Sequence, residues 1–349
     1  MHILGIANGT PGGNSEILLK AALRAATKTY PSITTSWIHV PSLWIPPSSV
    51  PLESSLNIPG TPRPVSEIQQ GIRDDRKAVL QAIMAADALI FSTPVQCHTP
   101  AGGLKALTDM ILGPHTDAAL AHRVSKAQDS GDKNLANIPF NPQLLKPRVA
   151  GFLAVAGSTT PDQITMVLPT LHLLIYSLHA KVVDQEVLLG NIMPGAVVFN
   201  NNGKAVERAE RLGVNVASQI GKSHDEARYL GPIPPGACPY CHLSKIDLFG
   251  REDNKIGCIT CGADGYLKMD SDGVVRPHWN SDSDLSCITM AGKQKHVDDL
   301  VAWTRKETEA IGSNPEASKR IDELRNIEIT AAIPIGGHGN DSLKDRHKL

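Results

Sequence analysis

Apolar and polar residues follow a repeating strand-and-helix pattern through the first 220 residues. Short runs of apolar and β-branched residues predict strands at residues 3–7, 33–40, 88–91, 149–156 and 182–189. Between these runs, apolar residues spaced three and four apart predict helices at residues 15–26, 65–86, 102–112, 161–178 and 204–220. Because strands that alternate with helices pair in parallel, the pattern predicts an α/β fold built on a parallel sheet.

Two segments interrupt this pattern. Residues 41–64 contain seven prolines among several serines. Proline is excluded from helix interiors and central strands, so this segment is predicted to be a long loop. Residues 113–147 are polar and weakly periodic and are predicted to be an insertion. Long loops in compact domains are often functional, so both segments are candidates for shaping a site.

The turn at residues 8–15 joins the first predicted strand to the first helix. Gly9, Gly12 and Gly13 allow a tight turn, and Asn14 or Ser15 can cap the helix. A helix N-terminus presents unpaired N–H groups and the positive end of a dipole, which favours an anionic ligand. The turn has neither the G-x-G-x-x-G of dinucleotide-binding folds nor the closing Lys-Ser or Lys-Thr of a P-loop. On this stretch alone, a turn without any ligand is the alternative.

Two further polar loops follow predicted strands, at residues 93–100 and 157–160. In a parallel sheet, the loops that follow the strands gather at the carboxyl edge, where ligands bind in such folds. We therefore expect residues 8–15, 93–100 and 157–160 to form one site.

Composition narrows the class of ligand. The chain has 349 residues, of which 41% are hydrophobic and 20% charged, and its net charge is −1. These values indicate a globular protein and argue against binding to nucleic acid or to an anionic membrane. The sequence shows neither a secretory signal pattern nor an apolar run of membrane-spanning length. We expect a cytoplasmic protein that acts on a small molecule.

Three segments resemble the flavodoxin-like NAD(P)H-dependent FMN reductases, including their iron–sulfur flavoprotein branch. They are LGIANGTPGGNSE from Leu4, DDRKAVLQAIMAADALIFSTPVQCHTPAGGLKALTDM from Asp74 and AGSTTP from Ala156. They are similar, in turn, to the family's phosphate loop, to the loop and helix beside the flavin ring, and to the loop on the other side of the flavin. The resemblance implies a flavodoxin-like, doubly wound sheet of five parallel strands in the order 2-1-3-4-5, with bound FMN and with NAD(P)H as hydride donor.

The matching positions imply a set of cofactor-binding residues. Thr10, Asn14 and Ser15 would hold the FMN phosphate, and the backbone of residues 94–97 and 157–159 would line the ring. Gly12 stands where the family carries an arginine, so the phosphate would be held without that cation. The whole implied set is Asn8, Thr10, Gly12, Gly13, Asn14, Ser15, Pro94, Val95, Gln96, Cys97, Gly157, Ser158 and Thr159.

Cys97 and His98 are the two candidates for catalytic groups, because a thiol beside a histidine can act as a nucleophile or as an acid–base pair. The alternative is that they only shape the pocket, since the hydride chemistry of a flavin needs no protein nucleophile. The iron–sulfur branch carries its cysteines after the second strand. Residues 41–64 contain none, which excludes a cluster there.

Four of the six cysteines form two C-x-x-C pairs, Cys238 with Cys241 and Cys258 with Cys261. Sixteen residues separate the pairs, and Gly262 follows the second pair, as in the knuckles of zinc ribbons. Four thiolates predict a closed, structural zinc site, with rubredoxin-like iron as the alternative because it takes the same ligands. Hairpins predicted at residues 246–257 and 266–276 complete a zinc-ribbon-like β module.

Helical spacing predicts two more helices, at residues 294–309 and 316–327. The predicted organisation is an FMN-binding domain at residues 1–230, a zinc-ribbon-like module at 231–286, terminal helices at 287–328 and a disordered tail at 329–349.

We predict an FMN-dependent oxidoreductase that passes hydride from NAD(P)H through FMN to an organic acceptor such as a quinone or an enone. One alternative is a flavin reductase or an electron-transfer flavoprotein with a rubredoxin-like iron site. Another is a degenerate flavodoxin-fold zinc scaffold. The resemblance also implies a homodimer or a homotetramer.

Overall fold

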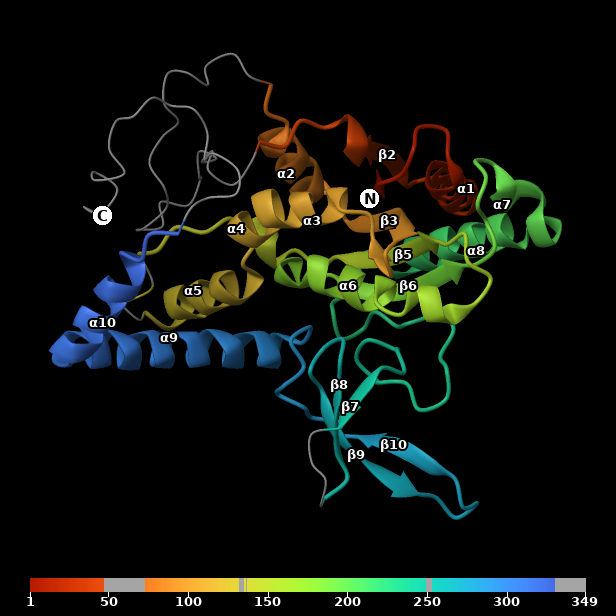
Figure 1. The fold of residues 1–349 in the computed structure, drawn as a ribbon. Coiled ribbons are helices and arrows are strands. Elements are labelled where there is room, and N and C mark those ends of the chain that lie inside the picture. Colours follow the sequence, from red (N-terminus) through yellow and green to blue (C-terminus); the bar gives the residue numbers. More distant parts are fainter. Residues whose placement is uncertain (47–72, 132–134, 136, 249–252, 330–349) are drawn as a thin grey trace. The chain divides into compact units, whose positions relative to one another are not determined.

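The computed structural model describes residues 1–46, 73–131, 135, 137–248 and 253–329. Most of the predicted proline-rich loop, the start of the helix predicted at residues 65–86 and nearly all of the predicted disordered tail lie outside these ranges. The chain forms two compact units, Met1–Val297 and Asp298–Leu349. Both sheets belong to the first unit (Figure 1).

Five parallel strands form the main sheet in the order β2-β1-β3-β5-β6, which confirms the predicted order 2-1-3-4-5. β5 is buried along its whole length, as expected of a central strand that helices cover on both faces. A short sixth strand, β4, pairs antiparallel with the end of β3. The strands are β1 (His2–Ala7), β2 (Thr34–His39), β3 (Ala88–Gln96), β4 (Thr99–Pro100), β5 (Val149–Val155) and β6 (Lys181–Leu188).

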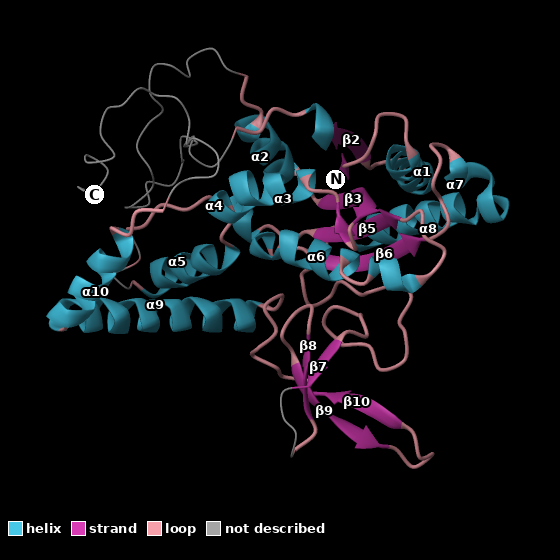
Figure 2. Cartoon of the chain, in the orientation of Figure 1, coloured by secondary structure: helices cyan, strands magenta, loops and turns pink. Residues whose placement is uncertain are grey.

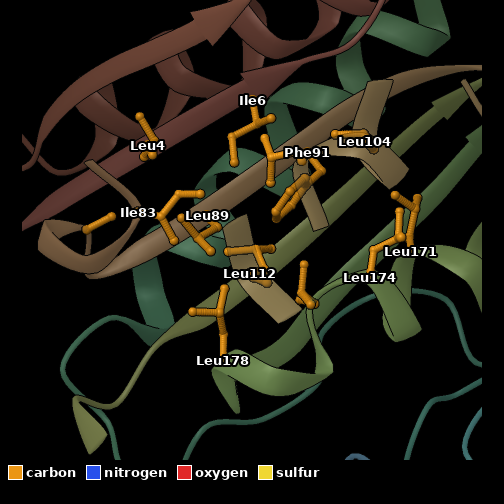
Figure 3. Packing of buried hydrophobic residues seen from close by; sticks show 14 of the residues in the cluster. Leu4, Ile6, Ile83, Leu89, Phe91, Leu104, Leu112, Leu171, Leu174 and Leu178 are labelled. Carbon is orange, nitrogen blue, oxygen red and sulfur yellow. The ribbon is translucent and has the colours of Figure 1, made fainter. Parts of the chain in front are cut away.

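Alternate side chains of the central strands enter two separate hydrophobic clusters. Leu4 and Ile6 enter the cluster beneath α2, α3 and α6 (Figure 3), whereas Ile3 enters the cluster beneath α1 and α8. This two-residue alternation places helices on both faces of the sheet, so the fold is doubly wound (Figure 2). The five helices are α1 (Asn14–Thr29), α2 (Arg76–Ala85), α3 (Gly103–Leu107), α6 (Val167–Leu174) and α8 (Lys204–Gln219).

Helices α1 and α8 approach one another closely at Gly213. A Cβ atom at this position would lie 2.0 Å from the carbonyl oxygen of Ala22, so only glycine allows the contact. The contact holds α1, whose first residues, Asn14 and Ser15, end the segment at residues 8–15.

Two helical predictions need correction. Residues 73–75 are not helical, and α2 begins at Arg76. The single helix predicted at residues 161–178 is broken into a 3₁₀ turn at Pro161–Ile164, helix α6 and a second 3₁₀ turn at Tyr176–Leu178. Pro169, which has no N–H and fits only in the first turn of α6, is the reason for the break before α6.

The polar segment at residues 113–147 contains a helix that the sequence pattern did not predict, α5 (Ala118–Ser130). Its buried positions are mostly alanine, which gives little hydrophobic contrast. The side chain of Asp117 accepts a hydrogen bond from the N–H of Leu120 at 2.8 Å, and Gly131 ends the helix in a left-handed conformation. These two caps are the signals that could have revealed it.

Several shorter helical segments complete the α/β layer. They are η1 (Val40–Ser42), the π turn η3 (Thr108–Leu112), α4 (Gly113–His115), η4 (Pro142–Leu145), α7 (Ala196–Phe199) and η7 (Asn200–Gly203).

A separate antiparallel sheet carries the cysteines, in the order β10-β9-β8-β7 (Figure 2). The two hairpins confirm the strands predicted for this module. The strands are β7 (Ile246–Leu248), β8 (Lys255–Cys258), β9 (Asp264–Met269) and β10 (Val275–Trp279).

Two helices end the described chain, α9 (Met290–Ser313) and α10 (Pro315–Arg325). They confirm the predicted helices at residues 294–309 and 316–327, although α9 extends beyond its prediction at both ends. A membrane-spanning helix would need a long apolar run that none of the described helices has.

Candidate functional site

The turn at residues 8–15 leads from the carboxyl end of β1 directly into α1. The N–H of Gly13 donates to the carbonyl oxygen of Thr10 at 2.9 Å, and Gly12 adopts a φ of 69°. Within the described ranges, no side chain caps α1 at Gly13, so the N–H groups of its first turn have no side-chain acceptor. Ser15 is buried beside them and Thr10 is exposed. The turn therefore offers hydroxyls and backbone donors that suit a phosphate.

Two side chains that the sequence analysis did not single out support this turn. Glu16 accepts from the N–H of Gly12 at 2.8 Å and pairs with Lys20 at 2.5 Å. The hydrogen bond from Lys20, followed by that from Gly12, holds the pKa of the Glu16 carboxyl below its usual range. His39 Nε2 donates to the carbonyl oxygen of Gly9 at 2.7 Å. Glu16 lies three residues after the N-cap, so the capping-box pattern could have revealed it in the sequence. His39 lies in another strand, so no local pattern links it to this turn.

Asn8 joins the first loop to the second. Its Nδ2 donates to the carbonyl oxygen of Ala101 at 2.8 Å, and its backbone N–H donates to the carbonyl oxygen of Ser92 at 2.8 Å. The side chain is buried, so it holds the two loops together from beneath.

The loop at residues 93–100 is a hairpin, which the sequence analysis did not predict. Gln96 pairs with Thr99 across the turn formed by Cys97 and His98, whose φ angles are 46° and 68°. Two-residue hairpin turns of this kind usually carry Asn-Gly, because both positions require positive φ. The Cys-His turn is therefore strained.

The hairpin turn is held against the next loop but leaves its own side chains accessible. The carbonyl oxygen of His98 accepts from the N–H of Met166 at 3.2 Å, and His98 Nδ1 lies 3.3 Å from Thr165 Oγ1. Cys97 is exposed. Pro94 and Val95 are half-buried, and Gln96 is exposed.

The third loop, which includes Gly157, Ser158 and Thr159, is paired with the residues after β6. The N–H of Gly190 donates to the carbonyl oxygen of Ser158 at 2.8 Å. The N–H of Asn191 donates to the carbonyl oxygen of Ala156 at 2.9 Å.

Asn14 connects the first loop to this third region. Its Nδ2 donates to the carbonyl oxygens of Asn191 at 3.3 Å and Met193 at 3.0 Å, and its Oδ1 accepts from the N–H of Val197 at 3.5 Å. Both ends of the Asn14 side chain are thus engaged in holding residues 191–197. No local sequence pattern could have indicated that Asn191 and its neighbours belong to this site, because their contacts with Asn14 span more than 170 positions along the chain.

An apolar surface borders the same loops. Ile192 is 76% exposed and Met193 is 67% exposed. A Cβ atom at Gly157 would lie 3.0 Å from Ile192 Cγ1, so Ile192 is adjacent to the third loop. The structure therefore brings together all three predicted loops and adds an apolar border that the sequence analysis missed.

The four predicted metal ligands meet in the small sheet. Their four Sγ atoms lie within 4.8 Å of one another and are all buried. Cys238 Sγ lies 3.6 Å from Cys261 Sγ, and Cys241 Sγ lies 3.5 Å from Cys258 Sγ. None of the four is in a disulfide. Four converging thiols are a donor set that suits a tetrahedral, thiophilic metal.

The two C-x-x-C knuckles have matching backbone geometry. The N–H of Cys238 donates to the carbonyl oxygen of Leu243 at 3.0 Å, and the N–H of Cys258 donates to that of Ala263 at 2.8 Å. The residue after each pair has positive φ, 61° at His242 and 78° at Gly262. Glycine adopts this conformation without strain, so Gly262 indicated the knuckle at the second pair in the sequence, whereas His242 gave no such indication at the first.

A buried hydrogen-bond chain connects this centre to the main sheet. His172 Nε2 donates to Gln185 Oε1 at 2.9 Å, and Gln185 Nε2 donates to the carbonyl oxygen of Cys241 at 2.8 Å. Burial lowers the pKa of His172 to about 4, so its imidazole is neutral.

Comparison with known proteins adds two findings. The profile of a family described as NADPH-dependent FMN reductase matches residues 1–193. The flavone synthase cfoJ of Aspergillus candidus is 35% identical over 303 residues, which cover 86% of this chain and 88% of that protein.

The structure is also similar to a solved structure of a flavone reductase. The TM-score is 0.70, the sequence identity is 23%, and the superposition covers 95% of this chain and 99% of the other. At this identity the similarity shows a shared fold, which includes the region beyond residue 193.

Proposed function

This chain belongs to the NADPH-dependent FMN reductase family, and on that premise we propose that its organic acceptor is a planar enone of the kind found in the oxygen heterocycle of a flavone. Family membership confirms the predicted NAD(P)H-dependent FMN oxidoreductase. The ring system of the acceptor rests on one observation, the 35% identity to a flavone synthase over 86% of this chain. The name of that relative describes formation of the flavone double bond, so the direction proposed here, its reduction, rests on the NADPH-dependent family. That likeness extends well beyond residues 1–193, which match the family profile.

The protein's part in this reaction is to bind and orient the reactants, while bound FMN supplies two-electron transfer from NAD(P)H to the acceptor. Thr10, Ser15 and the N–H groups at the start of α1, with Gly12 and Gly13, hold the phosphate in this proposal. Asn8 and Asn14 position the loops instead of contacting the phosphate directly. The backbone of residues 94–97 and 157–159 lines the ring.

The acceptor would lie against the apolar border at Ile192 and Met193. A flat aromatic ketone is mostly apolar, and sites for such ligands are built largely of apolar walls. Reduction of its carbon–carbon double bond adds a hydride at one carbon and a proton at the other. His98, on the exposed hairpin turn, is the candidate for that proton, and Cys97 beside it is the second candidate.

The absorbance spectrum of the purified protein tests the proposal in steps. We expect a flavin spectrum that bleaches when NADPH is added without oxygen and recovers when a flavone is added. Recovery with a quinone or with free FMN, but not with a flavone, would reject the proposed acceptor. A protein that remains colourless after addition of FMN would contradict the cofactor site itself.

We propose that the four thiols bind zinc in a closed site that has only a structural role. The support is the buried, converging set of four Sγ atoms. Metal analysis should find one zinc per chain. A red protein with one iron per chain would instead favour the electron-transfer alternative.

We further propose that the protein is cytoplasmic and that it forms a homodimer or homotetramer, which light scattering measures. We also propose that its domains are residues 1–230, 231–286 and 287–328. Limited proteolysis tests these boundaries near residues 230 and 287. A monomer at micromolar concentration would contradict the predicted assembly.

A further inference from the structure

A small cavity lies at the amino edge of the main sheet, away from the three loops. It is lined by the connection between α6 and β6, by His224 and by the start of α9, and its volume is about 30 Å³. Lys181 is the first residue of β6 and lines the cavity. The loops at the carboxyl ends of the strands therefore occupy the opposite edge.

Lys293 places an uncompensated charge in this cavity. Its exposed fraction is 4%, and its Nζ donates to the carbonyl oxygen of Cys287 at 3.0 Å. The ring of Tyr176 lies 5.5 Å from the same Nζ. Among the described residues, no carboxylate forms an ion pair with Lys293. Burial of an ammonium group without a counter-charge is costly and lowers the pKa of Lys293 to about 8, and an anion in the cavity would offset that cost.

Two further sources of positive potential meet at the same place. Lys181 lines the cavity, and so does Thr289, which lies directly before the first turn of α9. The N-terminus of a long helix carries a partial positive charge. None of the residues that line the cavity is acidic.

The nearest acidic and imidazole groups do not balance the positive charges of Lys293 and Lys181. Burial lowers the pKa values of both Lys293 and Lys181; Asp117 and Asp225 only partly oppose that effect, and neither carboxylate lines the cavity. His224 stacks on His179 with their ring centroids 4.1 Å apart, and burial lowers the pKa values of both rings. Both imidazoles are therefore neutral near pH 7, and His224 can donate an N–H into the cavity.

We propose that this cavity binds a small inorganic anion of the size of chloride, held by Lys293, Lys181 and the start of α9. A volume of about 30 Å³ is sufficient for one such ion. The ion would neutralise the buried ammonium and join α9 to the main sheet. The site lies away from the phosphate-binding turn, and Tyr240, which lies between Cys238 and Cys241, forms one of its walls.

Thermal unfolding of the full-length protein in different salts tests this proposal. At equal ionic strength, we expect a melting temperature about 3 °C higher in sodium chloride or bromide than in sodium gluconate, whose anion does not fit. Lys293→Met should abolish that difference, and the exposed-lysine control Lys28→Met should retain it. Equal melting temperatures of the wild type in all three salts would overturn the proposal.

A second measurement does not depend on any variant. Crystals of the wild-type protein soaked in bromide should show anomalous density next to Lys293 Nζ. Chloride NMR signals should broaden on addition of the protein and sharpen when bromide competes. Ordered water alone at this position, with no anomalous density, would reject the site even if Lys293→Met failed to fold.

Discussion

The main sheet and the cysteine-bearing sheet are stabilised in different ways. The main sheet buries two large hydrophobic clusters, one on each face. The buried cluster of the small sheet consists of the four cysteines with Leu243 and Ala263. Hydrophobic stabilisation grows with the apolar area buried, so the first sheet has a core of its own, whereas the second would depend on the zinc proposed above. We therefore expect the two sheets to unfold separately.

Removal of the metal should have the largest effect. Cys241→Ser leaves three thiolates, and the loss of a structural zinc site removes on the order of 10 kcal/mol of folding free energy from a small module. We expect the module to unfold while the main sheet retains FMN. Metal analysis measures the loss of the metal, protease sensitivity measures unfolding of the module, and the flavin spectrum measures retention of FMN. Cys97→Ser, outside the cluster, should retain the metal. Loss of FMN together with the metal would show that the sheets depend on each other.

Gly213→Ala tests the stability of the main sheet itself. The new Cβ would lie 2.0 Å from the carbonyl oxygen of Ala22, so α8 must shift away from α1. We expect a loss of about 3 kcal/mol in the free energy of unfolding, at the upper end for an overpacked site. Denaturant unfolding monitored at the main sheet measures it. Gly102→Ala adds its Cβ to open space and should cost much less.

Gln185→Leu should uncouple the two sheets. It leaves His172 Nε2 and the carbonyl oxygen of Cys241 buried without their partner, which costs about 1–3 kcal/mol. We expect the cysteine module to become protease-sensitive before the main sheet unfolds. Gln143→Leu, at an exposed glutamine, should change stability by no more than about 0.5 kcal/mol. A cysteine module as resistant to protease as that of the wild type would contradict the coupling role of Gln185.

The smallest effect concerns acid stability at the junction near β6. Burial, with the neighbouring positive charges, lowers the pKa of His179 to about 2 in the folded protein. Its unfolded pKa is about 6.5, so below that pH only the unfolded chain gains the proton. The folded state therefore loses about 1.4 kcal/mol per pH unit as the pH falls from about 6.5.

His179→Asn should remove this part of the acid dependence. Asparagine tolerates the positive φ of 51° at this position, so the backbone should be preserved. Unfolding free energies measured at pH 7 and pH 5.5 give the slope. An unchanged slope would show that His179 is protonated in the folded protein.

Local signals account for the parts of the protein that were predicted correctly. The strands are read from short apolar runs, the sheet order from the family resemblance, and the convergence of four cysteines from two C-x-x-C pairs. The missed helix α5 is rich in alanine, and the break before α6 follows from Pro169, which the prediction did not weigh. These two errors could have been avoided with the sequence alone.

The sequence by itself determined the parallel sheet, the three loops at its carboxyl edge and the four-cysteine module, because each depends on residues close together in the chain. Only the tertiary structure decided the roles of Asn14 and His39 and the burial of Lys293. Asn14 holds residues 191–197, and His39 supports the loop that follows another strand. Such contacts join residues far apart in the chain, and burial depends on every element that packs around a residue.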